Sequence, residues 1–152
     1  MPITIAVEPA DSADARALIA ELEAHLEPLY PAVSRHGYSV EKLLRERVAF
    51  FLIRQDGQPV GCGGVQLFGS EYAELKRMYV RPAFRGLGFA KQLLEHLAAY
   101  AQEHGLAILR LETGIHQHAA IKLYERMGFV QIAPFGSYRP DPLSRCYERR
   151  LC

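Results

Sequence analysis

The sequence contains no tryptophan, and only three of its 152 residues are cysteines. Cys62, Cys146 and Cys152 are odd in number and include no Cys-x-x-Cys pair, so they predict neither a disulfide framework nor a cysteine-based zinc site. Scarce cysteines of this kind are typical of a reducing compartment. We therefore expect a cytoplasmic protein whose cysteines carry no chemistry.

The sequence also lacks an excess of either charge and any long apolar run. The 18 Lys and Arg residues balance 17 Asp and Glu residues, which leaves a formal net charge of +1. No basic block would attract a nucleic-acid backbone, and no segment suits a membrane helix or a signal peptide. We expect neither nucleic acid nor a membrane as a partner. Because 49% of the residues are hydrophobic, residues 1–152 can bury one core, which predicts a single domain.

Apolar periodicity divides the chain into strands and helices. Strands are expected at residues 3–7, 48–53, 59–68, 72–80, 107–113, 129–132 and 144–151. Helices are expected after the Asp11-Ser12 cap, at residues 40–45, from Ala90 to the His104-Gly105 pair, and from Ala120 to Gly128. This order indicates a mixed α/β fold with helices on both faces of a sheet.

Details within the central strands carry local predictions. The Asp56-Gly57 pair between two apolar runs predicts a two-residue hairpin turn. Gly61, Gly63 and Gly64 would weaken their strand unless a neighbouring group packs closely against it. The imperfect alternation of residues 72–80 predicts a bulge.

The segment from Val80 to Ala90 is the most informative part of the chain. A strand ends, a loop with Gly86 and Gly88 follows, and a long helix begins. Glycine lets the backbone approach a ligand closely, and the first turn of a helix offers free N–H groups at the positive end of its dipole. Arg85 adds a forked donor. The segment predicts a pyrophosphate site, although two glycines alone would also suit a plain tight turn. The Walker and dinucleotide patterns are both absent.

Two blocks of the sequence resemble the GNAT superfamily of N-acetyltransferases. Arg85-Gly86-Leu87-Gly88-Phe89-Ala90 matches R/Q-x-x-G-x-G/A, the coenzyme A pyrophosphate motif of that family, and residues 120–129 resemble its A-x-x-L-Y-x-x-x-G-F segment. The clear resemblance covers residues 74–129. It implies an α/β (α+β) fold with a mixed, mostly antiparallel central sheet of about six or seven strands. It also implies an acyltransferase that moves an acetyl group from acetyl-CoA to a primary amine and needs no metal.

The resemblance assigns cofactor contacts to particular positions. Backbone groups of Met78, Tyr79 and Val80 would hold the pantetheine arm, and N–H groups of that strand would stabilise the developing oxyanion. Residues 85–90 would surround the pyrophosphate. Many family members carry Asn seven residues before the tyrosine of the second block, where this chain has Gln117. Gln makes similar amide hydrogen bonds with a different reach.

Glu74 and Tyr124 are the catalytic candidates that the resemblance implies. Glu74 occupies the place of a glutamate that takes a proton from the incoming ammonium, often through water. The structural alternative is that Glu74 pairs with a cation such as Lys76 or Arg77. Tyr124 occupies the place of a tyrosine that protonates the departing thiolate near the coenzyme A sulfur. It also falls on an apolar helical stripe, and its ring can pack while its hydroxyl serves chemistry.

His116 and His118 flank Gln117, and a His-x-His pair can bind metal. No third ligand lies nearby in the sequence, so polar residues at a helix start are the simpler interpretation. His116 stays open as a group that acts on the acceptor.

The acceptor is the least determined part of the prediction. The segments expected to shape its side are about residues 29–45 and 135–142, which hold Tyr30, Arg35, His36, Tyr38, Tyr138, Arg139 and Asp141. This mixture suits a small polar amine, including one that bears a carboxylate. A protein acetyltransferase that acts on lysines or N-termini is the alternative acceptor class, and a non-catalytic acyl-CoA-binding module is the alternative without turnover. A homodimer is left open.

Overall fold

The computed structural model describes residues 2–151, so Met1 and the third cysteine, Cys152, lie outside the described part of the chain. Seven strands form one sheet in the order β1-β2-β3-β4-β5-β7-β6. They are β1 (Ile3–Val7), β2 (Ala49–Gln55), β3 (Gln58–Phe68), β4 (Tyr72–Val80), β5 (Ile108–Gly114), β6 (Val130–Ile132) and β7 (Ser144–Arg150). Neighbouring strands are antiparallel except β4 and β5, which run parallel. The predicted mixed, mostly antiparallel sheet is confirmed.

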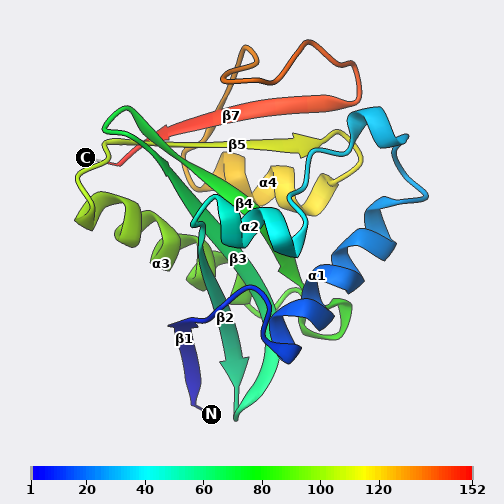
Figure 1. The fold of residues 1–152 in the computed structure, drawn as a ribbon, viewed down its shortest axis with the longest axis vertical. Coiled ribbons are helices and arrows are strands. Elements are labelled where there is room, and N and C mark those ends of the chain that lie inside the picture. The colour runs from blue at the N-terminus through cyan, green and yellow to red at the C-terminus, as the bar shows by residue number, and fades with distance from the viewer. Residues whose placement is uncertain (1, 152) are drawn as a thin grey trace.

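The parallel pair β4 and β5 is joined at one end only. Its register pairs Ala73 with Leu109 and Glu74 with Arg110, and no other pair joins the two strands within the described chain. Figure 1 shows the strands diverging beyond this contact. The sheet therefore opens into a wedge at its centre, between the second half of β4 and the end of β5.

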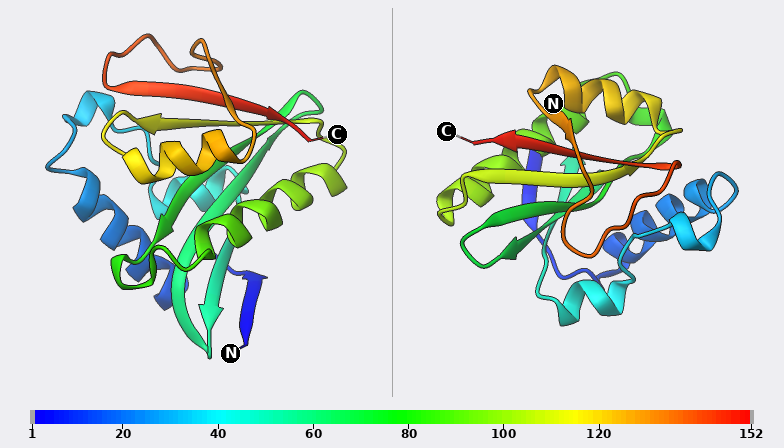
Figure 2. Two further views of the ribbon diagram at one scale, coloured as in Figure 1. Left: turned by 180° about the vertical axis from the view of Figure 1, so that it is seen from behind. Right: turned by 90° about the horizontal axis from the view of Figure 1, so that it is seen from above.

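Helices cover both faces of the sheet, as predicted. They are α1 (Ala13–Leu26), α2 (Val40–Arg45), α3 (Phe89–Glu103) and α4 (His118–Arg126). In the two views of Figure 2, α3 and α4 lie on one face, and α1 and α2 lie on the other. Each face has its own buried cluster: one packs α3 and α4 against the sheet, and the other packs α1 and α2.

The helix boundaries follow from local side-chain chemistry. Ser12 caps α1 by accepting a hydrogen bond from the N–H of Ala15 at 3.1 Å. Ser39 caps α2 in the same way through the N–H of Lys42, also at 3.1 Å. Gly105 follows α3 with a φ of +85°, a left-handed conformation that glycine adopts at little cost. The helix ends predicted at the Asp11-Ser12 cap and at the His104-Gly105 pair are therefore found where expected, and Ser39 is a further cap.

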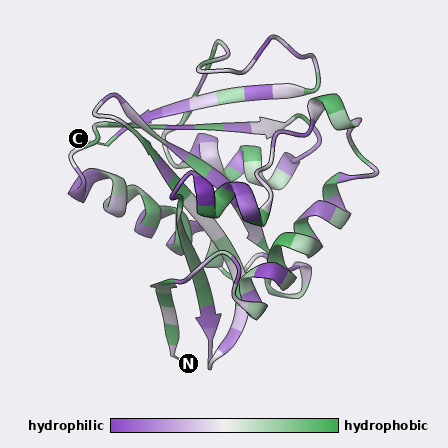
Figure 3. Cartoon of the chain, in the orientation of Figure 1, coloured by the Kyte–Doolittle hydropathy of each residue, from purple (hydrophilic) through white to green (hydrophobic). Residues whose placement is uncertain are grey.

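The strand β2 shows why the centre of the sheet is a stable platform. Phe51 and Ile53 belong to the cluster under α3, whereas Phe50 and Leu52 belong to the cluster under α1 and α2. A strand buried on both faces needs a continuous apolar run, and Figure 3 shows β2 as mostly hydrophobic with a hydrophilic end. The β2–β3 hairpin closes through Asp56 and Gly57, whose φ values of +52° and +81° suit the predicted two-residue turn.

The glycines of β3 allow β4 and its neighbours to approach closely. A Cβ on Gly61 would lie 2.7 Å from the carbonyl oxygen of Tyr79, and one on Gly63 would lie 2.6 Å from the Sδ atom of Met78. The expected close packing is confirmed. Opposite Gly63, β4 places both Arg77 and Met78, because Cys62 pairs with Tyr79 while Gly64 pairs with Lys76.

This extra residue is the predicted β-bulge in β4. Arg77 has a φ of +56°, which is uncommon for a residue other than glycine. A bulge bends its strand and re-aims the following side chain. Here it turns the second half of β4 away from β5 and brings Met78 into the wedge.

Candidate active site

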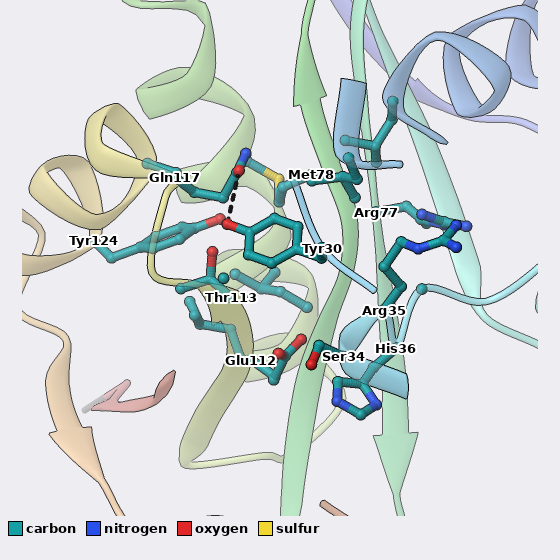
Figure 4. Close-up of a pocket in the computed structure, with 17 residues that line it drawn as sticks. Tyr30, Ser34, Arg35, His36, Arg77, Met78, Glu112, Thr113, Gln117 and Tyr124 are labelled. Atoms are coloured by element: carbon teal, nitrogen blue, oxygen red, sulfur yellow. Dashed lines mark hydrogen bonds between the residues drawn. The ribbon is translucent and has the colours of Figure 1, made fainter. Parts of the chain in front are cut away.

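A cavity of about 130 Å³ lies where β4 and β5 part. Its wall contains residues from α1, β4, β5, α4 and the segment after α1. Figure 4 shows Gln117 and Tyr124 on one side of this cavity and Arg35, His36 and Arg77 on the other. The polar residues of the lining are Tyr30, Ser34, Arg35, His36, Arg77, Glu112, Thr113, Gln117 and Tyr124. Of the two predicted catalytic residues, Tyr124 lines the cavity, whereas Glu74 is absent from its lining within residues 2–151.

The glycine loop leads from β4 to the first turn of α3. Gly86 and Gly88 have φ values of +77° and +87°, and a Cβ at either would meet open space. The N–H groups of residues 86–91 find no hydrogen-bond acceptor in the described chain, whereas the N–H of Gln92 already bonds the carbonyl of Gly88. Such a row of free donors at the N-terminus of a 15-residue helix favours an anion.

Some side chains of this loop point to solvent and others point into the core. Arg85 is exposed, and its Nε donates to the carbonyl of Val80 at 3.0 Å, which holds the guanidinium beside the loop. Leu87 is 60% exposed, but Phe89 is buried in the core and packs near Phe84. The Phe89 side chain therefore cannot contact a ligand on the loop, and only its backbone N–H stays available.

Met78, Tyr79 and Val80 alternate across β4. Met78 lines the cavity, Val80 is buried in the cluster under α3, and Tyr79 is buried on the opposite face, where its hydroxyl donates to Glu21 at 3.2 Å. For Tyr79 and Val80, only backbone groups can reach the cavity side. That is consistent with the backbone role expected for this strand.

Tyr124 combines packing with access to the cavity. Its ring lies in the core cluster beside Phe129, with ring centroids 5.7 Å apart. Burial, with the nearby charge of Glu112, raises the pKa of the Tyr124 hydroxyl above its usual value of 10.0. A phenol in these surroundings keeps its proton at neutral pH and can donate it. Within residues 2–151 this hydroxyl makes no hydrogen bond.

Gln117 is held in place by Tyr30. The Tyr30 hydroxyl donates to the side-chain oxygen of Gln117 at 3.1 Å and accepts from the backbone N–H of His116 at 3.0 Å (Figure 4). A Cβ on Gly114 would collide with the Tyr30 ring, so the end of β5 requires glycine to accommodate Tyr30. Because the amide oxygen is occupied, Gln117 presents its NH₂ group as the donor for a ligand.

Glu74 is buried among polar partners. It is 2% exposed, and its Oε2 accepts a hydrogen bond from the ammonium of Lys76 at 2.8 Å and another from the hydroxyl of Tyr138. Lys76 also lies 4.0 Å from the centre of the Tyr38 ring. The alternative that Glu74 pairs with a cation is therefore found, with Lys76 as the cation. Arg77 pairs instead with Glu23.

Glu112 is the cavity carboxylate that the sequence analysis missed. It lies on β5, and its Oε2 accepts a hydrogen bond from the Ser144 hydroxyl at 2.6 Å. Burial raises the pKa of Glu112 above its usual value, an effect that the Ser144 hydrogen bond partly offsets. The available sequence signal was the alternation of Leu109 and Leu111 with Arg110 and Glu112, which puts the two polar residues on one face of the strand.

The family model of the acetyltransferase (GNAT) family matches residues 15–129. The chain belongs to the GNAT acetyltransferase family. It is therefore an acetyltransferase, and the resemblance read from the glycine loop and the tyrosine block is confirmed.

Curated GNAT relatives act on different acceptors. The IAA acetyltransferase of Azospirillum brasilense is 42% identical over 135 residues, which cover 88% of each chain. The ribosomal protein bS18 alanine N-acetyltransferase of Escherichia coli K12 is 34% identical over 95 residues, which cover 62% of this chain and 64% of that protein. The names of these two relatives give different acceptors.

Solved structures show the same fold. A candidate acyl-CoA N-acyltransferase from Klebsiella pneumoniae has a TM-score of 0.84 at 38% identity and covers 99% of this chain and 98% of its own. The PaiA N-acetyltransferase of Thermoplasma acidophilum, crystallised with coenzyme A, has a TM-score of 0.75 at 19% identity over 99% of both chains. At the latter identity the likeness concerns the fold alone.

In the described residues, no three His, Cys, Asp or Glu side chains gather in a group that could hold a metal ion. The same residues include no helix that combines the length and the apolar character needed to cross a bilayer. Cys62 and Cys146 are both buried and form no disulfide, and burial raises the pKa of Cys62 to about 12, so this thiol is inert at neutral pH.

Proposed function

We propose that this GNAT protein transfers an acetyl group from acetyl-CoA to the primary amine of a small molecule, by direct attack within a ternary complex. The observation that carries the proposal is the cavity itself. Its wall brings Tyr124 and Met78 together with the charged side chains of Arg35 and Glu112. Its volume of about 130 Å³ is well below the roughly 300–1,000 Å³ of sites for drug-sized ligands, which favours a compact acceptor.

The residues present fit acetyl-CoA. The free N–H groups of residues 86–91 and the exposed Arg85 suit a pyrophosphate, and the open space above Gly86 and Gly88 leaves room for it. Backbone groups of residues 78–80 border the wedge that leads from this loop to Tyr124. When bound, acetyl-CoA supplies an acetyl group activated as a thioester.

The transfer requires proton movements at both ends of the reaction. A C–N bond forms between the acceptor nitrogen and the acetyl carbonyl carbon, and the C–S bond breaks. The nitrogen loses protons to a base, and the sulfur leaves as a thiolate that takes a proton. Tyr124 is the proposed acid, because its raised pKa keeps it protonated and its hydroxyl is free of other partners in residues 2–151. Backbone N–H groups near the bulge in β4 are the proposed donors to the carbonyl oxygen.

Two carboxylates are candidates for the base. Glu74, expected from the resemblance, would act through water, since it is buried and paired with Lys76. Glu112 lines the cavity directly. The two residues lie on adjacent strands, and the charge of Glu74 contributes to the raised pKa of Glu112. Their Gln variants distinguish the roles, as set out in the Discussion.

A screen of acceptors tests the proposal. Amines, amino acids and short peptides are each incubated with the protein and acetyl-CoA, and thiol release is followed. We expect turnover with one class of small amine and little with peptides. Because one relative acetylates the alanine of a ribosomal protein, acetylation of peptides or protein N-termini in preference to every small amine would favour a protein acceptor instead.

A further inference from the structure

The acceptor side of the cavity carries an excess of positive charge at one end. Arg77 is almost fully buried, and its Nε donates to the carbonyl of Tyr38 at 2.9 Å while its guanidinium pairs with Glu23. Arg35 approaches the same carboxylate, with 3.7 Å between its nearest nitrogen and the other oxygen of Glu23. Two guanidinium groups therefore share one carboxylate, and the three groups together keep a net charge of +1.

Arg35 also holds a donor that has no partner. Its Nε is buried, and nothing in residues 2–151 accepts a hydrogen bond from it. A buried donor without an acceptor is costly, and native structures rarely keep one unless water or a ligand completes it. A carboxylate is the group that best matches a guanidinium, because both are planar and can form two parallel hydrogen bonds.

The other end of the acceptor side is negative. Glu112 accepts a hydrogen bond from the Ser144 hydroxyl and lies near Ser34 and His36 in Figure 4, apart from the guanidinium group of Arg35. It is also close enough to Tyr124 for its charge to act on the pKa of that hydroxyl. A cation held by Glu112 would thus lie on the side of the cavity where acetyl transfer is proposed.

We propose that the acceptor is a compact molecule that carries both an amine and a carboxylate, with the carboxylate bound by Arg35 and the amine directed to Glu112. This inference rests on the proposed function and specifies its substrate class. The opposite charges at the two ends orient such a molecule, and the small volume favours a short spacing between its two groups. An amine without the carboxylate leaves the Nε of Arg35 unpaired.

Matched acceptors test the inference. Each amino acid that is acetylated is compared with the amine lacking its carboxylate and with its amide, and kcat and KM are measured separately by thiol release. We expect kcat/KM to be at least tenfold higher for the carboxylate-bearing member, mainly through KM. In Arg35→Gln this ratio should fall to within about threefold, and Arg35→Lys, which keeps the charge without the fork, should give an intermediate ratio.

Arg45→Gln is the control, because Arg45 is an exposed arginine on α2 outside the cavity, and it should leave the ratio as in the wild type. Circular dichroism of each variant shows that it has folded. Equal kcat/KM for both members of every pair, with turnover intact, would overturn this inference and leave the proposed function standing. Failure to acetylate any amine would instead overturn the proposed function.

Discussion

At the residue scale, Glu74 and Glu112 differ in how they are held. Glu74 was predicted from the resemblance, with Lys76 among its possible partners, but no sequence pattern could show that Tyr138, from a distant loop, would also bond it. Glu112 was missed because its importance depends on the divergence of β4 and β5, which is a property of the sheet. Tyr124 was found because its block is local in the sequence.

Tyr124→Phe tests the proposed acid. The variant keeps the ring that packs beside Phe129 and loses only the hydroxyl. A positioned acid contributes typically ~10²–10⁴-fold, and a thiolate is a good leaving group, so we expect kcat to fall by about 10²-fold or less. The KM for acetyl-CoA should stay nearly constant. If Tyr124→Phe were fully active across the pH range, the Tyr124 hydroxyl would not be the acid, and the residue would serve packing only.

Glu74→Gln and Glu112→Gln together identify the base. Removing the base should slow the reaction most at low pH, where the amine is mainly ammonium, and raising the pH should partly restore the rate. If Glu74 acts through water, its Gln variant shows this profile. If Glu112 acts directly, the profile belongs to Glu112→Gln. If the pH–rate profile were unchanged in both variants, neither carboxylate would be the base, and water or another group such as His116 would take the proton from the amine.

The raised pKa of Glu112 also predicts a pH-dependent stability. Because the folded protein holds this proton more tightly than the unfolded chain does, the contribution is fully present below the usual pKa of 4.5 and is lost as pH rises through the raised value. Glu112→Gln cannot ionise. Its free energy of unfolding relative to the wild type should therefore increase with pH across that window, as measured by urea denaturation at several pH values. A difference that is constant with pH contradicts the assignment.

At the element scale, the sequence predicted the strands and helices almost in full, because their ends are marked by local chemistry. Ser12 and Ser39 cap helices, Asp56-Gly57 closes the hairpin, and Gly105 follows α3. The bulge in β4 was predicted, but its position was not. That it lies at Arg77 and Met78 follows from pairing with β3, which is not local.

Gly88→Val tests the glycine loop as the site of acetyl-CoA binding. Gly88 has a φ of +87° at the start of α3, and a side chain there would occupy the open space proposed for the pyrophosphate. We expect the affinity for acetyl-CoA, measured by calorimetry, to fall tenfold or more, about 1.4 kcal/mol.

Gly105→Val is a matched control for Gly88→Val. Gly105 follows the other end of α3, has a φ of +85° and also faces open space, so the backbone strain is similar. It should bind acetyl-CoA as the wild type does. Equal affinity in a folded Gly88→Val protein would place the cosubstrate elsewhere.

At the scale of the whole molecule, the fold creates the site by leaving β4 and β5 unpaired over most of their length. Helices α3 and α4 lie on one face of that opening, whereas α1 and the segment after it supply Tyr30 and Arg35 from the other (Figure 2). Of the two segments expected on the acceptor side, residues 135–142 contribute nothing to the cavity lining in the described chain. The sequence analysis named the segment after α1, but it could not place these side chains relative to β5. That arrangement depends on the packing of Tyr30 against Gly114.

Direct transfer between two bound substrates is the central claim, and one labelling experiment tests it. The protein is mixed with acetyl-CoA labelled in the acetyl group, with and without an acceptor found in the screen, and small molecules and protein are both analysed by mass spectrometry. We predict one labelled N-acetyl product for each thiol released when the amine is present, and no acetylated protein when it is absent. Label on the protein without amine, or binding of acetyl-CoA with no transfer to any amine, would contradict the account.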